Sequence, residues 1–153
     1  MTPASVDVFR DPFQNTNLRL TPGAGVGYTI MDRGNIEWDI GAGGGFRYTE
    51  FVSVPAGSPT TERTSAFLFG TNLDWDVTKR VEVIFAHNAE VALAASGSTN
   101  QHATLLLSFE FFNDVDLDVS VIWDRIGDPV PDEGGEVPAA DDLCFSVGLG
   151  WEF

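Results

Sequence analysis

The C-terminal stretch Leu143–Phe153 reads LCFSVGLGWEF and places a large apolar side chain at every second position. The residues between them are cysteine, serine, glycine and glutamate, which are small or polar. This period of two predicts a β-strand with one apolar and one polar face, because successive side chains of a strand point to opposite sides. Most chain ends fray, so an alternation kept up to the last residue needs an explanation from the rest of the chain.

The same alternation recurs through the sequence. In 18–30, for example, Leu20, Val26 and Tyr28 fall on one side and Thr21 and Gly25 on the other. No segment shows the 3.6-residue period of an amphipathic helix. We therefore predict eight strands and no helix, at 4–9, 18–30, 36–49, 66–77, 81–91, 103–112, 116–125 and 143–153.

The connections between these strands alternate in length. Short ones at 32–35, 78–80 and 113–115 separate long ones at 10–17, 52–63, 94–101 and 127–141. In an antiparallel sheet this order puts all the tight turns at one end and all the long loops at the other. Outer-membrane β-barrels have this layout.

The chemistry of the two faces favours a membrane barrel over a soluble one. A soluble barrel points its apolar side chains inward and exposes charged ones. Here the polar face carries glycine, serine, threonine and carboxylates, and the chain has a single lysine, Lys79, in a turn. We therefore predict a polar lumen whose charged residues are Arg19, Glu37, Asp39, Arg47, Asp74, Asp76, Glu82, Glu90, Glu110, Asp116, Asp118 and Asp124.

Aromatic residues gather toward both ends of the strands. Trp38 and Tyr48 lie ten residues apart on one strand, or roughly 33 Å at about 3.3 Å per residue. With the usual tilt this spans roughly 25 Å, the height of the apolar band in such barrels. The membrane-facing aromatic belt is predicted to comprise Tyr28, Trp38, Phe46, Tyr48, Phe67, Phe69, Trp75, Phe111, Trp123, Phe145 and Trp151.

The predicted fold is an all-β, antiparallel, up-and-down transmembrane β-barrel that forms a single domain over residues 1–153. The sequence contributes eight strands. It leaves open whether these close on themselves or form the C-terminal part of a barrel of about ten to twelve strands.

Composition limits the classes of partner. The chain has 23 Asp and Glu against 8 Lys and Arg, a net charge of −15, which argues against binding nucleic acid phosphates. No apolar run is long enough for a transmembrane helix. The opening MTPASVDVFRDPF lacks the apolar core of a signal peptide.

Several spaced motifs carry a resemblance that covers nearly the whole chain. They resemble, in order, the salt-induced outer membrane protein family, also called YdiY-like. Those motifs are RDPFQN (10–15), RLTPGAGVGY (19–28), WDIGAGGGFRYTEF (38–51), LDWDVTKRVE (73–82), LDVSVIWDRIGDPVPD (117–132) and VGLGWEF (147–153).

This resemblance implies a Gram-negative outer-membrane β-barrel without established activity, site residues or cofactors. Its implied partners are membrane lipid, lipopolysaccharide and the barrel-insertion machinery. Leu149, Trp151 and Phe153 resemble the terminal strand signal that this machinery recognises. Family members carry a signal peptide and more chain before the RDPF motif, so this chain looks short at its N-terminus.

Two glycine runs and an acidic loop invite chemical interpretations. GAGVG (23–27) and GAGGG (41–45) miss the G-x-G-x-x-G pattern and open no helix. We interpret them as room for a narrow lumen or for strong curvature. The loop 127–141 lacks EF-hand ligand spacing, so weak divalent-cation binding there stays open and no metal cluster is predicted.

The sequence indicates the function of the protein less directly than its fold. The inward carboxylates outnumber their evident partners Arg19, Arg47 and Arg125, which indicates a wet lumen. We therefore predict a structural role or a minor passive channel that prefers cations, with no catalytic residues.

The alternative is an outer-membrane lipid-modifying enzyme of the lipid A deacylase type, with a histidine followed by a serine two residues later. His87 and His102 are instead followed by Ala89 and Thr104. The sequence shows no carboxylate that would orient either imidazole, as nucleophilic catalysis requires.

Overall fold

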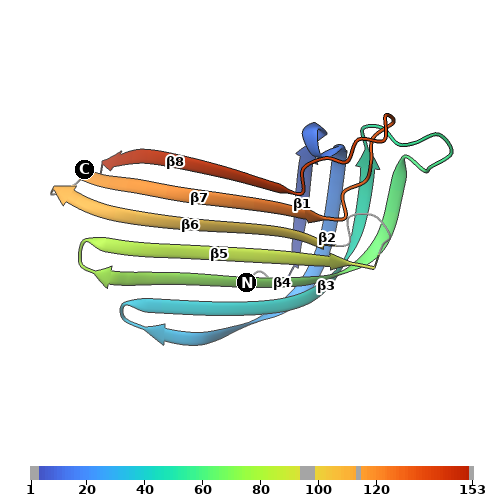
Figure 1. Ribbon diagram of the computed structural model, residues 1–153. Helices are drawn as coiled ribbons and strands as arrows, with labels where there is room; N and C mark the ends of the chain where they lie inside the picture. The colour runs from blue at the N-terminus through green and yellow to red at the C-terminus, as the bar shows by residue number, and fades with distance from the viewer. Residues whose placement is uncertain (1–3, 94–98, 113–114, 152–153) are drawn as a thin grey trace.

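The computed structural model describes residues 4–93, 99–112 and 115–151. Eight strands form one antiparallel sheet in which each strand pairs with its neighbours in the chain, as Figure 1 shows. The prediction of eight antiparallel strands is confirmed. They are β1 (Ala4–Asp11), β2 (Thr16–Arg33), β3 (Ile36–Phe51), β4 (Thr61–Thr78), β5 (Val81–Ala92), β6 (Thr99–Phe112), β7 (Val115–Gly127) and β8 (Asp141–Trp151).

Strands β4 and β6 begin earlier than their alternation predicts. The register of β4 runs on to the pair Glu50–Thr61 and that of β6 to Val91–Thr99. These extensions, TERTS and TNQH, are polar on both faces, so a hydrophobic period cannot detect them. Backbone pairing alone continues the strands beyond the apolar band.

The prediction of no helix is wrong for one short turn. Pro12–Gln14 form a 3-10 helix between β1 and β2. The carboxylate of Asp11 accepts hydrogen bonds from the backbone N–H of Phe13 at 2.9 Å and of Gln14 at 3.3 Å. Asp as the N-cap and Pro at the first position are typical helix starts. No helix in the described residues is long and apolar enough to cross a membrane.

The sheet bends most where glycines of β2 and β3 face each other. Gly25 pairs with Gly43, and a Cβ on Gly25 would lie 2.6 Å from the carbonyl oxygen of Ala42. A Cβ on Gly43 would lie 2.8 Å from the Cα of Gly25 and would also meet the oxygen of Ala24. Only glycine allows the two backbones to curl this tightly. In Figure 1, β1 and the parts of β2 and β3 beside it accordingly turn across the direction of β5–β8, while the rest of β2 and β3 runs alongside β4.

The eight strands form a strongly curled half-barrel. Within the described residues, β1 pairs only with β2 and β8 only with β7. β1 also covers only part of its neighbour, because its register on β2 extends from Thr16 to Ala24. The sheet therefore presents two edges with unpaired backbone groups.

The convex face of the sheet is apolar and the concave face polar. Concave Thr21, Arg47 and Thr49 are at most 2% exposed. Tyr48 and Trp123 of the predicted belt are half-buried, and the side chain of Trp151 lies outside the described part. The other belt residues are between 39% and 71% exposed, namely Tyr28, Trp38, Phe46, Phe67, Phe69, Trp75, Phe111 and Phe145.

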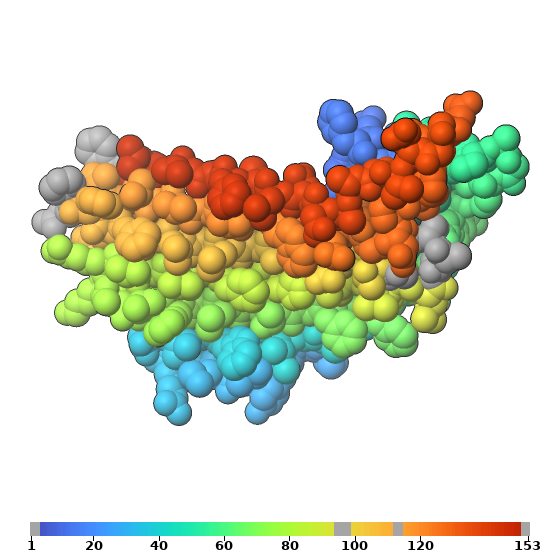
Figure 2. All heavy atoms as spheres, in the orientation of Figure 1, coloured from blue at the N-terminus to red at the C-terminus, as the bar shows by residue number. Residues whose placement is uncertain are grey.

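Three long connections meet at one end of the molecule. Figure 2 shows the β1–β2 turn in blue, the loop 128–140 in orange and the loop 52–60 in green on the same end. The side chain of Asn15 joins them: its amide donates to Ser53 O at 2.9 Å and Val130 O at 3.2 Å, and its oxygen accepts from Ser53 N at 3.0 Å. We call this the loop end, and the opposite end the short-turn end.

Candidate functional site: the charged concave face

The concave face is acidic toward the short-turn end. Glu82 of β5 interacts electrostatically with Asp74 and Asp76 of β4 and with Asp118 of β7. The strand registers place the other carboxylates of this region on the same face, because Glu37 pairs with Asp74 and Glu110 with Asp116. We refer to this group as the acidic zone; it comprises Glu37, Asp39, Asp74, Asp76, Glu82, Glu110, Asp116 and Asp118.

Toward the loop end the same face carries charges of both signs. Arg47 is 1% exposed, and its Nε lies 3.5 Å from Oε1 of Glu90. Thr21 donates a hydrogen bond of 3.1 Å to Oε2 of Glu90. These contacts link β2 and β3 to β5 across the curl of the sheet, and the ion pair keeps the buried guanidinium compensated.

Arg19 lies beside this pair in a different environment. It is 5% exposed, and its guanidinium lies over the ring of Phe9 at 5.2 Å from the ring centre. Among the described residues its Nε has no hydrogen-bond partner. A guanidinium has five N–H donors and prefers oxygen acceptors, so the N–H at Nε is one donor that the protein leaves unused.

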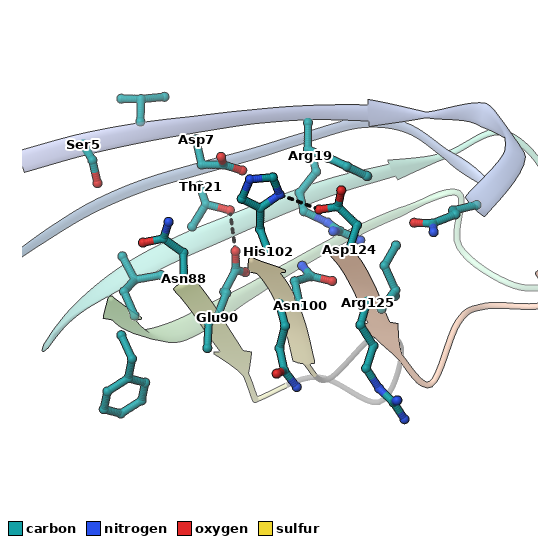
Figure 3. Close-up of a pocket in the computed structure, with 18 residues that line it drawn as sticks. Ser5, Asp7, Arg19, Thr21, Asn88, Glu90, Asn100, His102, Asp124 and Arg125 are labelled. Carbon is teal, nitrogen blue, oxygen red and sulfur yellow. Dashed lines mark hydrogen bonds and ion pairs between the residues drawn. The ribbon is translucent and has the colours of Figure 1, made fainter. Parts of the chain in front are cut away.

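A cavity of about 530 Å³ opens next to Arg19. Figure 3 shows that side chains from β1 and β2 on one side and from β5, β6 and β7 on the other point into it. The size lies within the range of small-molecule sites. Its polar lining includes Ser5, Asp7, Gln14, Arg19, Thr21, Asn88, Glu90, Asn100, His102 and Asp124.

The structure overturns one expectation about histidine. His102 does have an orienting carboxylate, because its Nδ1 lies 2.7 Å from Oδ1 of Asp124. The hydroxyl of Thr104 lies 3.3 Å from Nε2 of the same ring. A carboxylate can only accept, so Nδ1 donates to Asp124, and in the neutral ring Nε2 then accepts from Thr104. The pairing of His102 with Asp124 across β6 and β7 creates this arrangement.

Arg125 was wrongly assigned as a partner of the lumen carboxylates. Its neighbour Asp124 occupies the concave face, so Arg125 points to the convex one, where it pairs with Asp141 at 3.3 Å. His87 also lies on the convex face, paired in register with Thr71.

The described residues contain no group of three or more potential ligands placed to hold a metal ion. Glu152 and Phe153 lie outside the described part.

Several cavity residues were absent from the sequence-based site. Asp7 lies on a short edge strand, and Asn88 and Asn100 are neutral side chains without a motif. Alternation with outward-facing neighbours marks Asp7 and Asn88 as inward-facing, which is the one signal that could have identified these two. Asn100 lies in the polar stretch 99–102, which carries no such signal. The meeting of all three with Arg19 depends on the curl of the sheet.

The curled sheet, with its apolar convex face and charged concave face, defines a porin-like β-barrel fold. The structure is similar to one described as "NanC porin structure in rhombohedral crystal form", with a TM-score of 0.52 and 8% sequence identity. The similarity covers 90% of this chain and 65% of the NanC chain.

Residues 2–153 match the family described as "Protein of unknown function, DUF481", and the chain belongs to that family. None of the curated proteins matches the chain.

Proposed function

We propose that the protein forms an outer-membrane β-barrel through which small polar solutes pass passively. The observation that carries the proposal is the division of the sheet into an apolar convex face and a concave face lined by charge. Convex Val26, Phe145 and Leu149 are 78%, 68% and 79% exposed. Soluble proteins rarely expose so continuous an apolar surface, whereas lipid solvates it.

The outer membrane is supported by the porin-like fold and by the resemblance to the salt-induced outer membrane protein family. The expected partners are lipid and lipopolysaccharide around the convex face and the insertion machinery at β8. Unpaired strand edges are not tolerated in lipid. In the inserted form both β1 and β8 are therefore paired, either with each other or with further strands, and only the second arrangement widens the lumen beyond that of an eight-stranded barrel.

Reconstitution tests this function. The protein, purified from outer membranes and inserted into planar bilayers, should give discrete conductance steps. A barrel with a purely structural role would insert, shown by resistance to detergent and a mobility shift on boiling, without conducting. That result would refute the channel.

A second candidate function is hydrolysis of an acyl ester, favoured by the Thr104–His102–Asp124 arrangement. The hydroxyl of Thr104 would pass its proton to Nε2 of His102 as its oxygen attacks the ester carbonyl carbon. His102 would then give that proton to the departing alkoxide, and water would release the acyl group from Thr104. This candidate ranks second because a threonine hydroxyl is hindered and the group faces the lumen instead of lipid.

Single substitutions test the esterase. Hydrolysis of p-nitrophenyl butyrate should disappear in Thr104→Ala and persist in Thr104→Ser, which keeps a hydroxyl. Ser108→Ala changes another hydroxyl on the same face of β6 and should have no effect. Equal rates in Thr104→Ala and the unaltered protein would exclude the arrangement as a catalyst.

A further inference from the structure

The unused bonding capacity of Arg19 points to a ligand. Burying a charged group without partners costs several kcal/mol, and Arg19 is 95% buried, since its exposed fraction is 5%. The neighbouring Arg47 offsets this cost by an ion pair with Glu90, in which Nε and Oε1 lie 3.5 Å apart. No carboxylate forms an ion pair within 4.0 Å of Arg19 in the described residues, although Glu90, Asp7 and Glu62 attract it from farther away. An oxygen acceptor that enters the cavity would supply the hydrogen-bond partner that Arg19 lacks.

The chemistry of that acceptor follows from the geometry of a guanidinium. Its planar fork matches the two oxygens of a carboxylate, with two parallel hydrogen bonds. Phe9 covers one face of the Arg19 guanidinium, with 5.2 Å between the guanidinium carbon and the ring centre. A ligand can therefore approach in the plane of the guanidinium, where its N–H groups point. A carboxylate is thus the group that fits.

A simple anion is nevertheless disfavoured by the rest of the lining. Glu90 pairs with Arg47 and also attracts Arg19, as do Asp7 and Glu62. The charged residues that line the cavity are the carboxylates of Asp7, Glu90 and Asp124 against Arg19 and Arg125. Asp7 is exposed and pairs in register with Thr21, two residues from Arg19. The cavity therefore has a net negative charge, and the acidic zone lies on the path beyond it.

A simple cation is disfavoured for the opposite reason. It would meet the carboxylates but leave Nε of Arg19 without a hydrogen-bond acceptor, and Arg19 would repel it. A molecule with both a carboxylate and an ammonium group satisfies the two sides of the cavity at once. Asn88, Asn100 and Thr21 add neutral donors and acceptors between them.

We propose that the cavity at the loop end binds a small zwitterionic solute, of the amino-acid type, with its carboxylate on Arg19 and its ammonium group toward Asp7 and Asp124. This inference rests on the proposed function and names the class of solute that the channel selects. It also gives Nε of Arg19 the hydrogen-bond acceptor that it lacks among the described residues.

Calorimetric titration of the refolded protein in detergent tests the binding site. The probes are L-alanine and 4-aminobutyrate, two zwitterions with short and long charge separation, together with butyrate and butylamine. At least one zwitterion should bind more tightly than both singly charged probes. Equal binding of butyrate, or no heat with any probe, would overturn the proposal.

Two substitutions locate the site. Arg19→Gln should weaken zwitterion binding about tenfold or more, because a charged hydrogen-bonded pair is lost. Asp7→Asn should weaken zwitterion binding as well. Because Asp7 is exposed on the edge strand β1, this second variant tests the site even if Arg19→Gln folds poorly. The control Arg33→Gln removes an exposed arginine at the far end of β2 and should bind normally. Unchanged affinity in Asp7→Asn and Arg19→Gln would refute the assignment.

Conductance separates this proposal from the one on which it rests. Conductance steps in bilayers, together with no zwitterion binding, would refute the binding site but support the channel. Zwitterion binding without conductance would leave the site and refute the channel.

Discussion

At the scale of single residues, Asn15 determines how the loop end is held together. It adopts a left-handed conformation with φ 57°, which asparagine tolerates better than most residues. Its amide donates to carbonyl oxygens 38 and 115 residues away in the chain, those of Ser53 and Val130. One side chain thus fixes two loops against the end of β2.

Substitution Asn15→Asp should release the loop 128–140. Aspartate keeps the oxygen that accepts from Ser53 N and tolerates the same backbone conformation, but it cannot donate to the two loops. Loss of these hydrogen bonds should cost about 1–3 kcal/mol, equivalent to a roughly 5- to 150-fold larger open population. Cleavage by a glutamate-specific protease after Glu133 and Glu136 should become faster by the same factor as the open population grows.

The control for this change is Asn17→Ala. Asn17 donates to Glu50 at 2.9 Å within the strands and contacts neither loop, so its loss should leave the cleavage rate unaltered. Equal cleavage rates in Asn15→Asp and the unaltered protein would show that Asn15 does not restrain the loop.

At the scale of the elements, the pairing of β2 with β3 depends on glycine. Substitution Gly43→Ala would place a methyl group against Ala24 O and 2.8 Å from Gly25 Cα, so the backbones must separate. Overpacking of this kind costs about 1–3 kcal/mol or more. The substitution should lower the yield of heat-modifiable barrel after refolding and its midpoint in urea.

The neighbouring residue supplies the control. A Cβ on Gly44 would meet only Ala66 O, at 3.8 Å, which is an ordinary contact. Gly44→Ala should therefore refold as the unaltered protein does. If both alanine variants refold equally well, the close approach of β2 and β3 does not govern the curl.

Sequence alone identifies the strands but not the site they enclose. Alternation predicts β8 and β2 because each has one apolar face and one polar face. It cannot predict that Thr21 meets Glu90, 69 residues away, since this contact arises from the curl that the glycines permit. The pair His102–Asp124 was predictable only with the register of β6 on β7, which a face pattern does not specify.

At the scale of the whole molecule, charge is distributed unevenly along the concave face. The acidic zone lies at the short-turn end, and Arg19 and Arg47 lie at the loop end. A lumen lined by one sign of charge concentrates ions of the opposite sign, and this effect grows as salt is lowered. The proposed channel should therefore prefer cations, most strongly in dilute salt.

Neutralising two members of the acidic zone tests this preference directly. The double variant Asp74→Asn, Glu82→Gln should lower the permeability of potassium relative to chloride, measured as a reversal potential across a salt gradient. Glu82 interacts with Asp74, Asp76 and Asp118, so these charges act together where an ion must pass. The matched control Glu133→Gln, Glu136→Gln removes the same charge from the exposed loop 128–140 and should leave the ratio unchanged. An equal fall in both variants would mean that net charge, and not the acidic zone, governs selectivity. An unaltered ratio in the first variant would place the conducting path away from this face.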